Sequence, residues 1–368
     1  MFPNKKIGGF IERGGLSAPI TVTWEVTNRC NLRCLHCLSD SSPEADIRGE
    51  LNLDEAKAVA GQLAAAGVFQ VHFGGGEPFV YPGFFELLHH CRAQGMGCIC
   101  ISTNGSLLDE RRIGKLEKLG GVYLQLSLDG GTESSCDSIR GAGTFRKVIS
   151  ALERLRASSI VRTINFVYCR SNAHELDDAL QVARKFGATL RVTRLKPSGR
   201  GAAIYETMRP AQDQLFRLHE WLGAHPDVLT GDTFFHLNPL GSTPLKGFQF
   251  CGAAKLTCLI TPGGDVYPCA FTQTENFRAG NLRRESFLAI WRESGVFNGV
   301  FRAGTEGPCG SCKAYETCGG GCPAVKYAVA GRLDIPDPDC VLPVQVGQAE
   351  RSRPPQTSDR SSQTHTMG

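Results

Sequence analysis

The sequence contains no long hydrophobic run, no secretion signal and no block of like charge. No stretch of about 18 consecutive apolar residues occurs, so a membrane-spanning helix is not expected. Met1–Gly15 is glycine-rich and lacks the apolar segment of a signal peptide. Basic and acidic residues are interspersed around a formal net charge of +4, without the basic patch that nucleic acid requires. We therefore expect a cytoplasmic protein that binds neither membrane nor nucleic acid.

Cysteine, by contrast, is plentiful. The 368 residues include 16 cysteines. A chain without a secretion signal is expected in a reducing compartment, where cysteines serve metal binding more often than disulfide bonding. The sequence therefore predicts metal sites.

A strand-then-helix rhythm repeats six times in the first half of the chain. The candidate strands are rich in Val, Ile and aromatic residues; they are Ile20–Val26, Val68–Phe73, Gly97–Ser102, Val122–Leu128, Val161–Tyr168 and Thr189–Leu195. Alternating strands and helices indicate an α/β fold with a parallel sheet covered by helices. Six units are too few for an eight-fold barrel, so we expect a partial (β/α)6 TIM-like barrel. Asn52 and Glu55 form a capping pattern for the first of these helices, which Gly67 would end.

Changes in composition divide the chain further. The expected parts are an N-terminal extension (1–19), the barrel (20–205), a helical bridge (206–250) with a loop around Thr230–Pro239, a cysteine-rich domain (251–345) and a disordered tail (346–368). The cysteine-rich part has few periodic apolar segments, so we expect metal to stabilise it in place of a large core.

Cys30, Cys34 and Cys37 follow the first predicted strand in a C-x3-C-x2-C pattern. Three closely spaced thiolates suit three irons of a [4Fe-4S] cluster and leave the fourth iron open for chemistry. A zinc knuckle is the alternative reading of such a triplet.

Polar or glycine-rich motifs also follow the other strands. They are Gly74–Pro78, Ser102–Gly105, Ser127–Gly130 and Lys196–Gly201. In parallel α/β folds the carboxyl ends of the strands share one face, where active sites are built. We therefore expect these motifs to meet the cysteine triplet at one rim.

The triplet, with His36 before its last cysteine, and the Gly75-Gly76-Glu77-Pro78 element resemble the signatures of radical S-adenosylmethionine (SAM) enzymes. The resemblance implies that the open iron chelates the methionyl group of SAM and that its cleavage releases a 5'-deoxyadenosyl radical. The expected SAM-binding residues are His36, Gly75, Gly76, Glu77, Pro78, Asn104, Ser127, Asp129 and Arg140. The GGEP element would receive the SAM ammonium, while amide, hydroxyl and guanidinium groups suit the ribose and the carboxylate. Strand-end capping is the alternative for the last four residues, and packing is the alternative for His36.

A second group of cysteines lies near the C-terminus. Cys309, Cys312, Cys318, Cys322 and Cys340 are preceded by Cys251, Cys258 and Cys269. The spacing is similar to that of SPASM domains, which hold auxiliary iron–sulfur clusters in radical SAM enzymes that modify peptides. The alternative is zinc, which also suits C-x2-C pairs.

The resemblance to SPASM domains implies two auxiliary [4Fe-4S] clusters and three clusters in all. Cys251, Cys258, Cys269 and Cys322 would hold the first auxiliary cluster, and Cys309, Cys312, Cys318 and Cys340 the second. We expect these fully ligated clusters to transfer electrons. The remaining cysteines are expected to be small buried residues; they are Cys91, Cys98, Cys100, Cys136 and Cys169.

Longer stretches resemble one family, the mycofactocin radical SAM maturases, over roughly residues 19–342. They are Thr23–Thr27, Arg191–Gly201, Leu229–Leu237 and Cys251–Ala253. One small departure is Ala270, where proline is usual after the cysteine.

This family resemblance implies maturation of a small ribosomal precursor peptide (RiPP maturation). The C-terminal Tyr would be oxidatively decarboxylated, and a C–C bond between Val and Tyr would then close a ring. Only about 19 residues precede the first predicted strand, so a separate leader-binding protein is expected, together with an electron donor such as a ferredoxin or flavodoxin. Other SPASM maturases (sulfatase-maturing, quinone-cofactor or haem-pathway) remain alternatives. A non-catalytic iron–sulfur electron carrier is less compatible, because it needs neither the open-iron triplet nor the GGEP element.

Overall fold

The structure is a computed structural model. It describes residues 16–230, 234–241, 245, 251–300 and 307–342. The predicted extension up to residue 15, part of the predicted bridge and the predicted tail lie outside these residues.

One sheet of nine strands organises the molecule, in the order β6-β5-β4-β3-β2-β1-β7-β8-β9. The strands are β1 (Thr21–Thr27), β2 (Gln70–Gly75), β3 (Cys98–Thr103), β4 (Val122–Ser127), β5 (Val161–Tyr168), β6 (Thr189–Arg194), β7 (Thr257–Ile260), β8 (Asp265–Tyr267) and β9 (Gly280–Asn281). The first six are parallel and neighbour each other in chain order. They lie where the sequence placed them, and the prediction of a partial barrel is confirmed.

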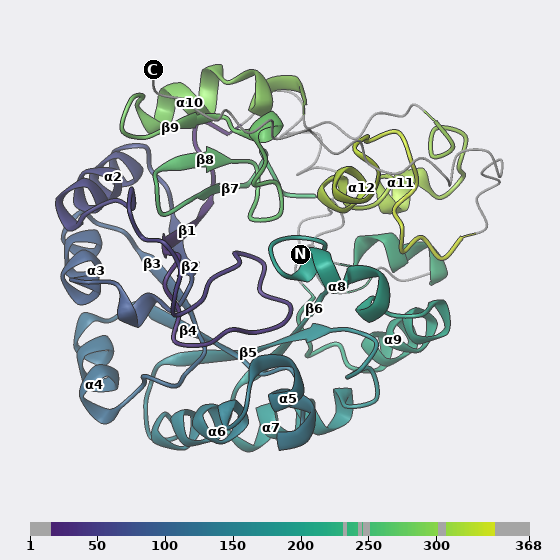
Figure 1. Cartoon of the computed structure of the whole chain (residues 1–368), viewed down its shortest axis with the longest axis horizontal. Coiled ribbons are helices and arrows are strands. Elements are labelled where there is room, and N and C mark those ends of the chain that lie inside the picture. The colour runs from purple at the N-terminus through teal and green to yellow at the C-terminus, as the bar shows by residue number, and fades with distance from the viewer. Residues whose placement is uncertain (1–15, 231–233, 242–244, 246–250, 301–306, 343–368) are drawn as a thin grey trace, which may run out of the picture.

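Helices cover the outer side of the curved sheet (Figure 1). They are α2 (Leu53–Ala65), α3 (Phe84–Ala93), α4 (Glu110–Leu119), α5 (Glu133–Arg140), α6 (Thr144–Arg154) and α7 (Leu176–Lys185). Asn52 and Glu55 form the expected capping box of α2, each side chain accepting from the backbone N–H of the other residue. The reciprocal pair satisfies two of the N–H groups that a helix start leaves open.

Alternate residues of the barrel strands face opposite ways. In β3, Ile99 and Ile101 are buried, whereas Cys98, Cys100 and Ser102 are only partly buried. The same alternation recurs in β4 and β6. Because side chains on a strand point to opposite faces, the apolar set packs under the helices and a largely polar set lines the concave inside of the barrel.

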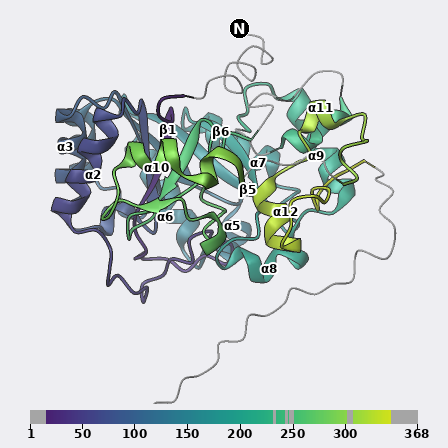
Figure 2. The same ribbon diagram turned by 90° about the horizontal axis from the view of Figure 1, so that it is seen from above.

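Beyond β6 the chain forms α8 (Gly201–Met208), α9 (Gln212–Ala224) and the short 3₁₀ helix η2 (Phe235–Leu240). The cysteine-rich part adds α10 (Phe287–Glu293), α11 (Tyr315–Cys318) and α12 (Pro323–Ala330). In Figure 2, α11 and α12 lie at the end of the molecule opposite α2 and α3. No helix in the described ranges is long and apolar enough to cross a bilayer.

The cysteine-rich part shares its core with the barrel, which the sequence did not predict. Strand β7 pairs in parallel with β1, with Val22 opposite Cys258. Ile260, Val266 and Ile290 consequently join the main hydrophobic core. The expectation that this part lacks apolar mass is therefore wrong for its first half, because pairing with β1 places its apolar residues against the barrel.

Candidate functional site

The cysteine triplet lies in the loop after β1, which crosses the open side of the barrel in Figure 1. Backbone hydrogen bonds hold this loop at two points. Cys30 N donates to Ser42 O at 3.0 Å, and Leu35 N donates to Ile139 O at 2.9 Å. The triplet is therefore fixed at the carboxyl edge of the parallel strands, where the sequence placed it.

A second segment, Lys196–Gly201 after β6, clasps this loop. Arg200 donates from its backbone N to Cys37 O at 3.0 Å and from Nε to Cys34 O at 2.9 Å. Ser198 Oγ donates to Leu38 O at 3.0 Å. Gly199 has φ +52°, and a Cβ there would lie 2.5 Å from the carbonyl oxygens of Cys37 and Leu38. Only glycine permits this approach, so the segment positions the triplet.

The three thiols of the triplet influence each other electrostatically. Burial raises the pKa of Cys30 to about 12, and the neighbouring Cys34 and Cys37 add to the shift. Burial also raises the pKa of Cys34, while the guanidinium of Arg140 opposes the change. A bound metal deprotonates its thiol ligands outright, so thiols gathered in a partly buried loop beside a cation fit the three irons of a cluster.

The GGEP element packs against the chain that leads into Cys30. Gly76 N donates to Thr27 O at 2.7 Å, and Glu77 N donates to Arg29 O at 3.0 Å. A Cβ at Gly76 would lie 2.0 Å from Arg29 O. The expected close approach of a ligand stays a prediction; in the structure the glycines make room for the protein's own backbone.

Glu77 is turned inward. Its side chain is buried and accepts from Thr103 Oγ1 at 2.8 Å and from the backbone N of Asn104 at 2.9 Å. Burial raises the pKa of Glu77 to about 7, although these hydrogen bonds favour its charged form. Glu77 thus holds the end of β3, while its expected contact with the SAM ammonium stays a prediction. Pro78, also buried, opens the next 3₁₀ turn (Pro78–Val80).

One buried cluster contains three of the expected side chains, which are Asp129, His36 and Arg140. Asp129 Oδ2 lies 2.6 Å from His36 Nε2 and 2.5 Å from Arg140 Nε, and Asp129 is fully buried. Burial alone would raise the pKa of Asp129, but Arg140 and His36 lower it to about 2. Arg140 Nη1 in turn lies 3.8 Å from Cys34 Sγ. In this arrangement Asp129 contacts the cysteine loop at His36, and Arg140 contacts it at Cys34. The contact of these two residues with SAM stays a prediction.

Asn104 and Ser127 lie at the ends of β3 and β4. Asn104 Nδ2 donates to Asn31 Oδ1 at 2.9 Å and lies 3.9 Å from Cys30 Sγ. Ser127 is partly exposed on the concave side of β4. Both are therefore at the rim with the triplet, as the sequence predicted, although no described contact tests their role toward SAM.

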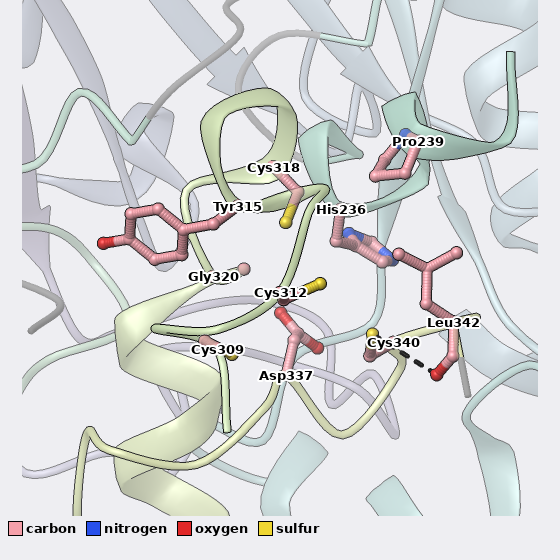
Figure 3. Close-up of a pocket in the computed structure, with 11 residues that line it drawn as sticks. His236, Pro239, Cys309, Cys312, Tyr315, Cys318, Gly320, Asp337, Cys340 and Leu342 are labelled. Carbon is pink, nitrogen blue, oxygen red and sulfur yellow. Dashed lines mark hydrogen bonds between the residues drawn. The ribbon is translucent and has the colours of Figure 1, made fainter. Parts of the chain in front are cut away.

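Four cysteines surround one cavity in the C-terminal part (Figure 3). Cys309, Cys312, Cys318 and Cys340 line it, together with His236 and Asp337. Their charges act on each other, since Cys340 and Cys312 contribute to the pKa of Cys309, which burial raises. These are the four residues expected to hold the second auxiliary cluster, and the fold brings them together.

The first auxiliary site is only partly assembled as expected. Cys251, Cys269 and Cys322 pack within one small cluster. Burial raises the pKa of Cys269 to about 11, with Lys196 opposing the shift and Cys322 adding to it. Three of the four predicted ligands therefore lie together.

Cys258 departs from the prediction. It is fully buried in the main core with Ile260, whereas Leu259 between them packs with Cys251 and Cys269. Because side chains alternate along a strand, Cys258 points to the face of β7 opposite the other three cysteines. This structure therefore does not bring Cys258 to the other three cysteines, and its assignment as a cluster ligand stays a prediction.

The other cysteines divide into two groups. Cys91, Cys136 and Cys169 are buried, as predicted, whereas Cys98 and Cys100 lie partly exposed on the concave face of β3. Within the described ranges, no three His, Cys, Asp or Glu side chains are arranged to hold a single metal ion. In a [4Fe-4S] cluster each cysteine binds a different iron. The cysteines of a cluster site are therefore farther apart than the ligands of a single metal ion.

Sequence reasoning missed the residues that join the barrel to the auxiliary sites. Arg194 at the end of β6 binds Asp337 and Asp339, and His236 lies 3.0 Å from its Nη1. Asp337 also accepts from the backbone N of Cys322 at 2.7 Å. The only sequence signal was two aspartates shortly before Cys340, which do not reveal a partner 143 residues away.

Two family models match the chain. The radical SAM superfamily model matches residues 24–183, and the SPASM iron–sulfur cluster-binding domain model matches residues 251–320. The second match ends before Cys322 and Cys340.

Curated relatives extend this similarity over nearly the whole chain. The mycofactocin maturase MftC of Mycobacterium ulcerans is 43% identical over 331 residues, covering 89% of each chain. The PqqA peptide cyclase of Gluconobacter oxydans is 32% identical, covering 89% of this chain and 91% of its own. Among solved structures, Streptococcus suis SuiB bound to S-adenosylmethionine superposes with a TM-score of 0.74 at 20% identity, covering 92% of this chain and 81% of SuiB. That structural likeness supports the fold.

Proposed function

The chain belongs to the radical SAM superfamily and, within it, to the family of mycofactocin maturases, and we propose that it matures a small ribosomal precursor peptide. The observation that carries the proposal is the fixed cysteine loop at the carboxyl edge of the barrel, with Cys30, Cys34 and Cys37 beside a buried cation. When bound there, an open-iron cluster supplies the electron that cleaves SAM to a 5'-deoxyadenosyl radical.

We infer that the reaction acts on a peptide that ends in Val-Tyr. Removal of a hydrogen atom from the tyrosine Cβ, loss of the terminal carboxylate as CO2 and loss of one electron leave a C=C bond. Removal of a hydrogen atom from valine then allows a C–C bond to close a ring; returning one electron and one proton makes this second step an isomerisation. The 43% identity to the M. ulcerans maturase supports this substrate class.

The residues of the chain position these reactants. The clasp Lys196–Gly201 and the Asp129–Arg140 pair keep the cysteine loop in place. Hydrogen transfer requires the substrate carbon within about 3–3.5 Å of the radical carbon, so small displacements of this loop reduce the rate.

We propose ten cysteines as cluster ligands. Cys30, Cys34 and Cys37 would bind the SAM cluster, Cys309, Cys312, Cys318 and Cys340 one auxiliary cluster, and Cys251, Cys269 and Cys322 the other. Three [4Fe-4S] clusters would result, the auxiliary ones accepting the electron released in the first step. The leader-binding protein and the ferredoxin- or flavodoxin-type donor stay predictions.

Mass spectrometry tests the proposal. Anaerobically reconstituted protein is incubated with SAM, a reductant, the leader-binding protein and a precursor peptide that ends in Val-Tyr. The expected product has lost one CO2 and two hydrogen atoms, and ring closure changes the retention time at constant mass. Replacing all three triplet cysteines by Ala should abolish 5'-deoxyadenosine formation. An unchanged peptide beside normal 5'-deoxyadenosine formation would reject the substrate while leaving the radical SAM chemistry intact.

A further inference from the structure

A lysine is buried beside the second auxiliary site. Lys326 on α12 is only 1% exposed, and its Nζ donates to Gly320 O at 3.2 Å. The other arginine or lysine side chains buried in the described ranges are Arg140 and Arg194, and each is paired with a carboxylate. In those same ranges no carboxylate oxygen lies within 4.0 Å of Lys326 Nζ. Burying an ammonium without a counter-charge is costly, so Lys326 requires a negative partner of another kind.

The position of Gly320 places this ammonium next to the cavity of the second auxiliary site. Gly320 lines that cavity together with the four cysteines (Figure 3). A Cβ added at Gly320 would lie 3.5 Å from Lys326 Nζ and 3.8 Å from Cys309 Cβ. The ammonium and Cys309 are therefore neighbours of the same glycine. Their charges interact accordingly, since burial raises the pKa of Cys309 and the charge of Lys326 opposes the rise.

The carboxylates near this cavity have other partners. Asp337 lines the cavity, but both of its oxygens accept from Arg194. The pKa of Asp334 is lowered first by its hydrogen bond with Arg332, and the charge of Lys326 contributes only after other causes. Four thiolates around a [4Fe-4S] core, in contrast, carry about two negative charges in total, and reduction adds one more. A cluster in this cavity therefore supplies the counter-charge that Lys326 requires.

We propose that Lys326 is the counter-charge of the second auxiliary cluster and raises its reduction potential, so that this cluster accepts the electron released in the first step. The inference rests on the proposed function for the source of that electron. A buried ammonium stabilises the reduced cluster more than the oxidised one, because the reduced cluster carries one more negative charge. Lys326 acts through the cluster and touches neither SAM nor the peptide, so it is a positioning residue.

A redox titration followed by electron paramagnetic resonance tests the proposal. The full chain is reconstituted anaerobically, and the signal that changes when SAM is added belongs to the SAM cluster. Cys312→Ser alters one ligand of the second auxiliary cluster and thereby identifies its signal. Lys326→Met should shift the equilibrium of that cluster about 10- to 100-fold toward the oxidised form, where each factor of ten corresponds to about 59 mV for one electron. The potentials of the other two clusters should stay unchanged.

Three further variants separate charge from packing. Lys326→Arg keeps the charge and should keep the wild-type potential, whereas Lys326→Gln keeps a donor for Gly320 O without the charge and should shift the potential as Lys326→Met does. Lys313→Gln is the matched control, because Lys313 directly follows Cys312 but is exposed to water, which screens its charge.

An unshifted potential in Lys326→Met or Lys326→Gln, or an equal shift in Lys313→Gln, overturns the proposal. The iron content of each variant is measured as well. Loss of one cluster's iron in both neutral variants but not in Lys326→Arg supports the counter-charge, whereas the same loss in all three variants assigns Lys326 to packing and overturns it.

Peptide masses separate this inference from the proposed function, because the redox titration contains no peptide. With precursor peptide and leader-binding protein, Lys326→Met should form the decarboxylated product at least about tenfold more slowly than wild type. A shifted potential beside a peptide that even wild type leaves unchanged refutes the proposed substrate alone. Peptide conversion by wild type beside an unshifted potential in Lys326→Met refutes the role of Lys326 alone. A shifted potential with undiminished decarboxylation refutes this cluster as the electron acceptor.

Discussion

Arg194 binds Asp337 through both of its terminal nitrogens, at 3.1 and 2.9 Å, across the junction between the barrel and the cysteine-rich part. Both side chains are only 1% exposed. Asp337 also accepts from the backbone of Cys322 and lines the cavity of the second auxiliary site. A strand of the barrel is thus bonded directly to the segments that carry both groups of auxiliary cysteines.

We expect Asp337→Asn to destabilise the protein by about 3–5 kcal/mol, because it leaves a buried guanidinium without its main partner. Thermal unfolding and iron content of the reconstituted protein measure the effect. The exposed pair Arg33–Glu44, with side chains 67% and 71% exposed, provides the control. Glu44→Gln should cost less than about 1 kcal/mol, and equal effects of the two changes would contradict the prediction.

Iron content also tests the position of Cys258. We expect Cys258→Ala to retain all its iron and to lose about 1 kcal/mol of stability through the small cavity in the core. Cys269→Ala, on the opposite face of the hairpin, should lose the iron of one cluster. If Cys258→Ala loses as much iron as Cys269→Ala, the strand must rearrange when the cluster binds.

Gly199 gives a test of the clasp. Gly199→Ala places a Cβ 2.5 Å from two carbonyl oxygens of the cysteine loop. It should therefore reduce SAM cleavage and the iron of the SAM cluster, in addition to the strain of about 1–2 kcal/mol for a left-handed residue. Gly67→Ala is matched, because Gly67 has φ +76° but no atom within 4 Å of the added Cβ. It should lower stability and leave SAM cleavage unchanged; similar cleavage rates in both variants would refute the clasp.

The raised pKa of Glu25 predicts that the stability of the protein depends on pH. Burial raises the pKa of Glu25 from 4.5 to about 7, against hydrogen bonds from Ser39 and Gln273. Between these values the folded protein keeps a proton that the unfolded chain releases, so stability falls as the pH rises from about 5 to about 7 and levels off above.

Glu25→Gln should remove this slope. At pH 8 it should be more stable than wild type by up to about 3 kcal/mol relative to the difference at pH 5. Denaturant unfolding at the two pH values measures this. Parallel stability curves for wild type and variant would show that Glu25 is not the titrating group.

Local patterns in the sequence were sufficient to predict the barrel. The β-branched and aromatic runs located β1–β6 to within two residues, and the capping box of α2 was readable because both partners lie within one turn. The position of the triplet directly after a predicted strand located it at the rim, since each strand of a parallel sheet ends at the same edge. These features depend on residues close to one another in the chain.

Tertiary structure decided the rest, because it depends on which faces meet. Cys258 has a sequence spacing suited to a cluster, but its side chain lies on the face of β7 that packs in the main core. Which face that is becomes known only once β7 pairs with β1. Arg194 and Asp337 are 143 residues apart, so only the fold brings them together. The sequence by itself determined which residues have the side chains and the spacing to bind iron and SAM. The pairing of distant strands decided which of those side chains lie on the same face of the sheet.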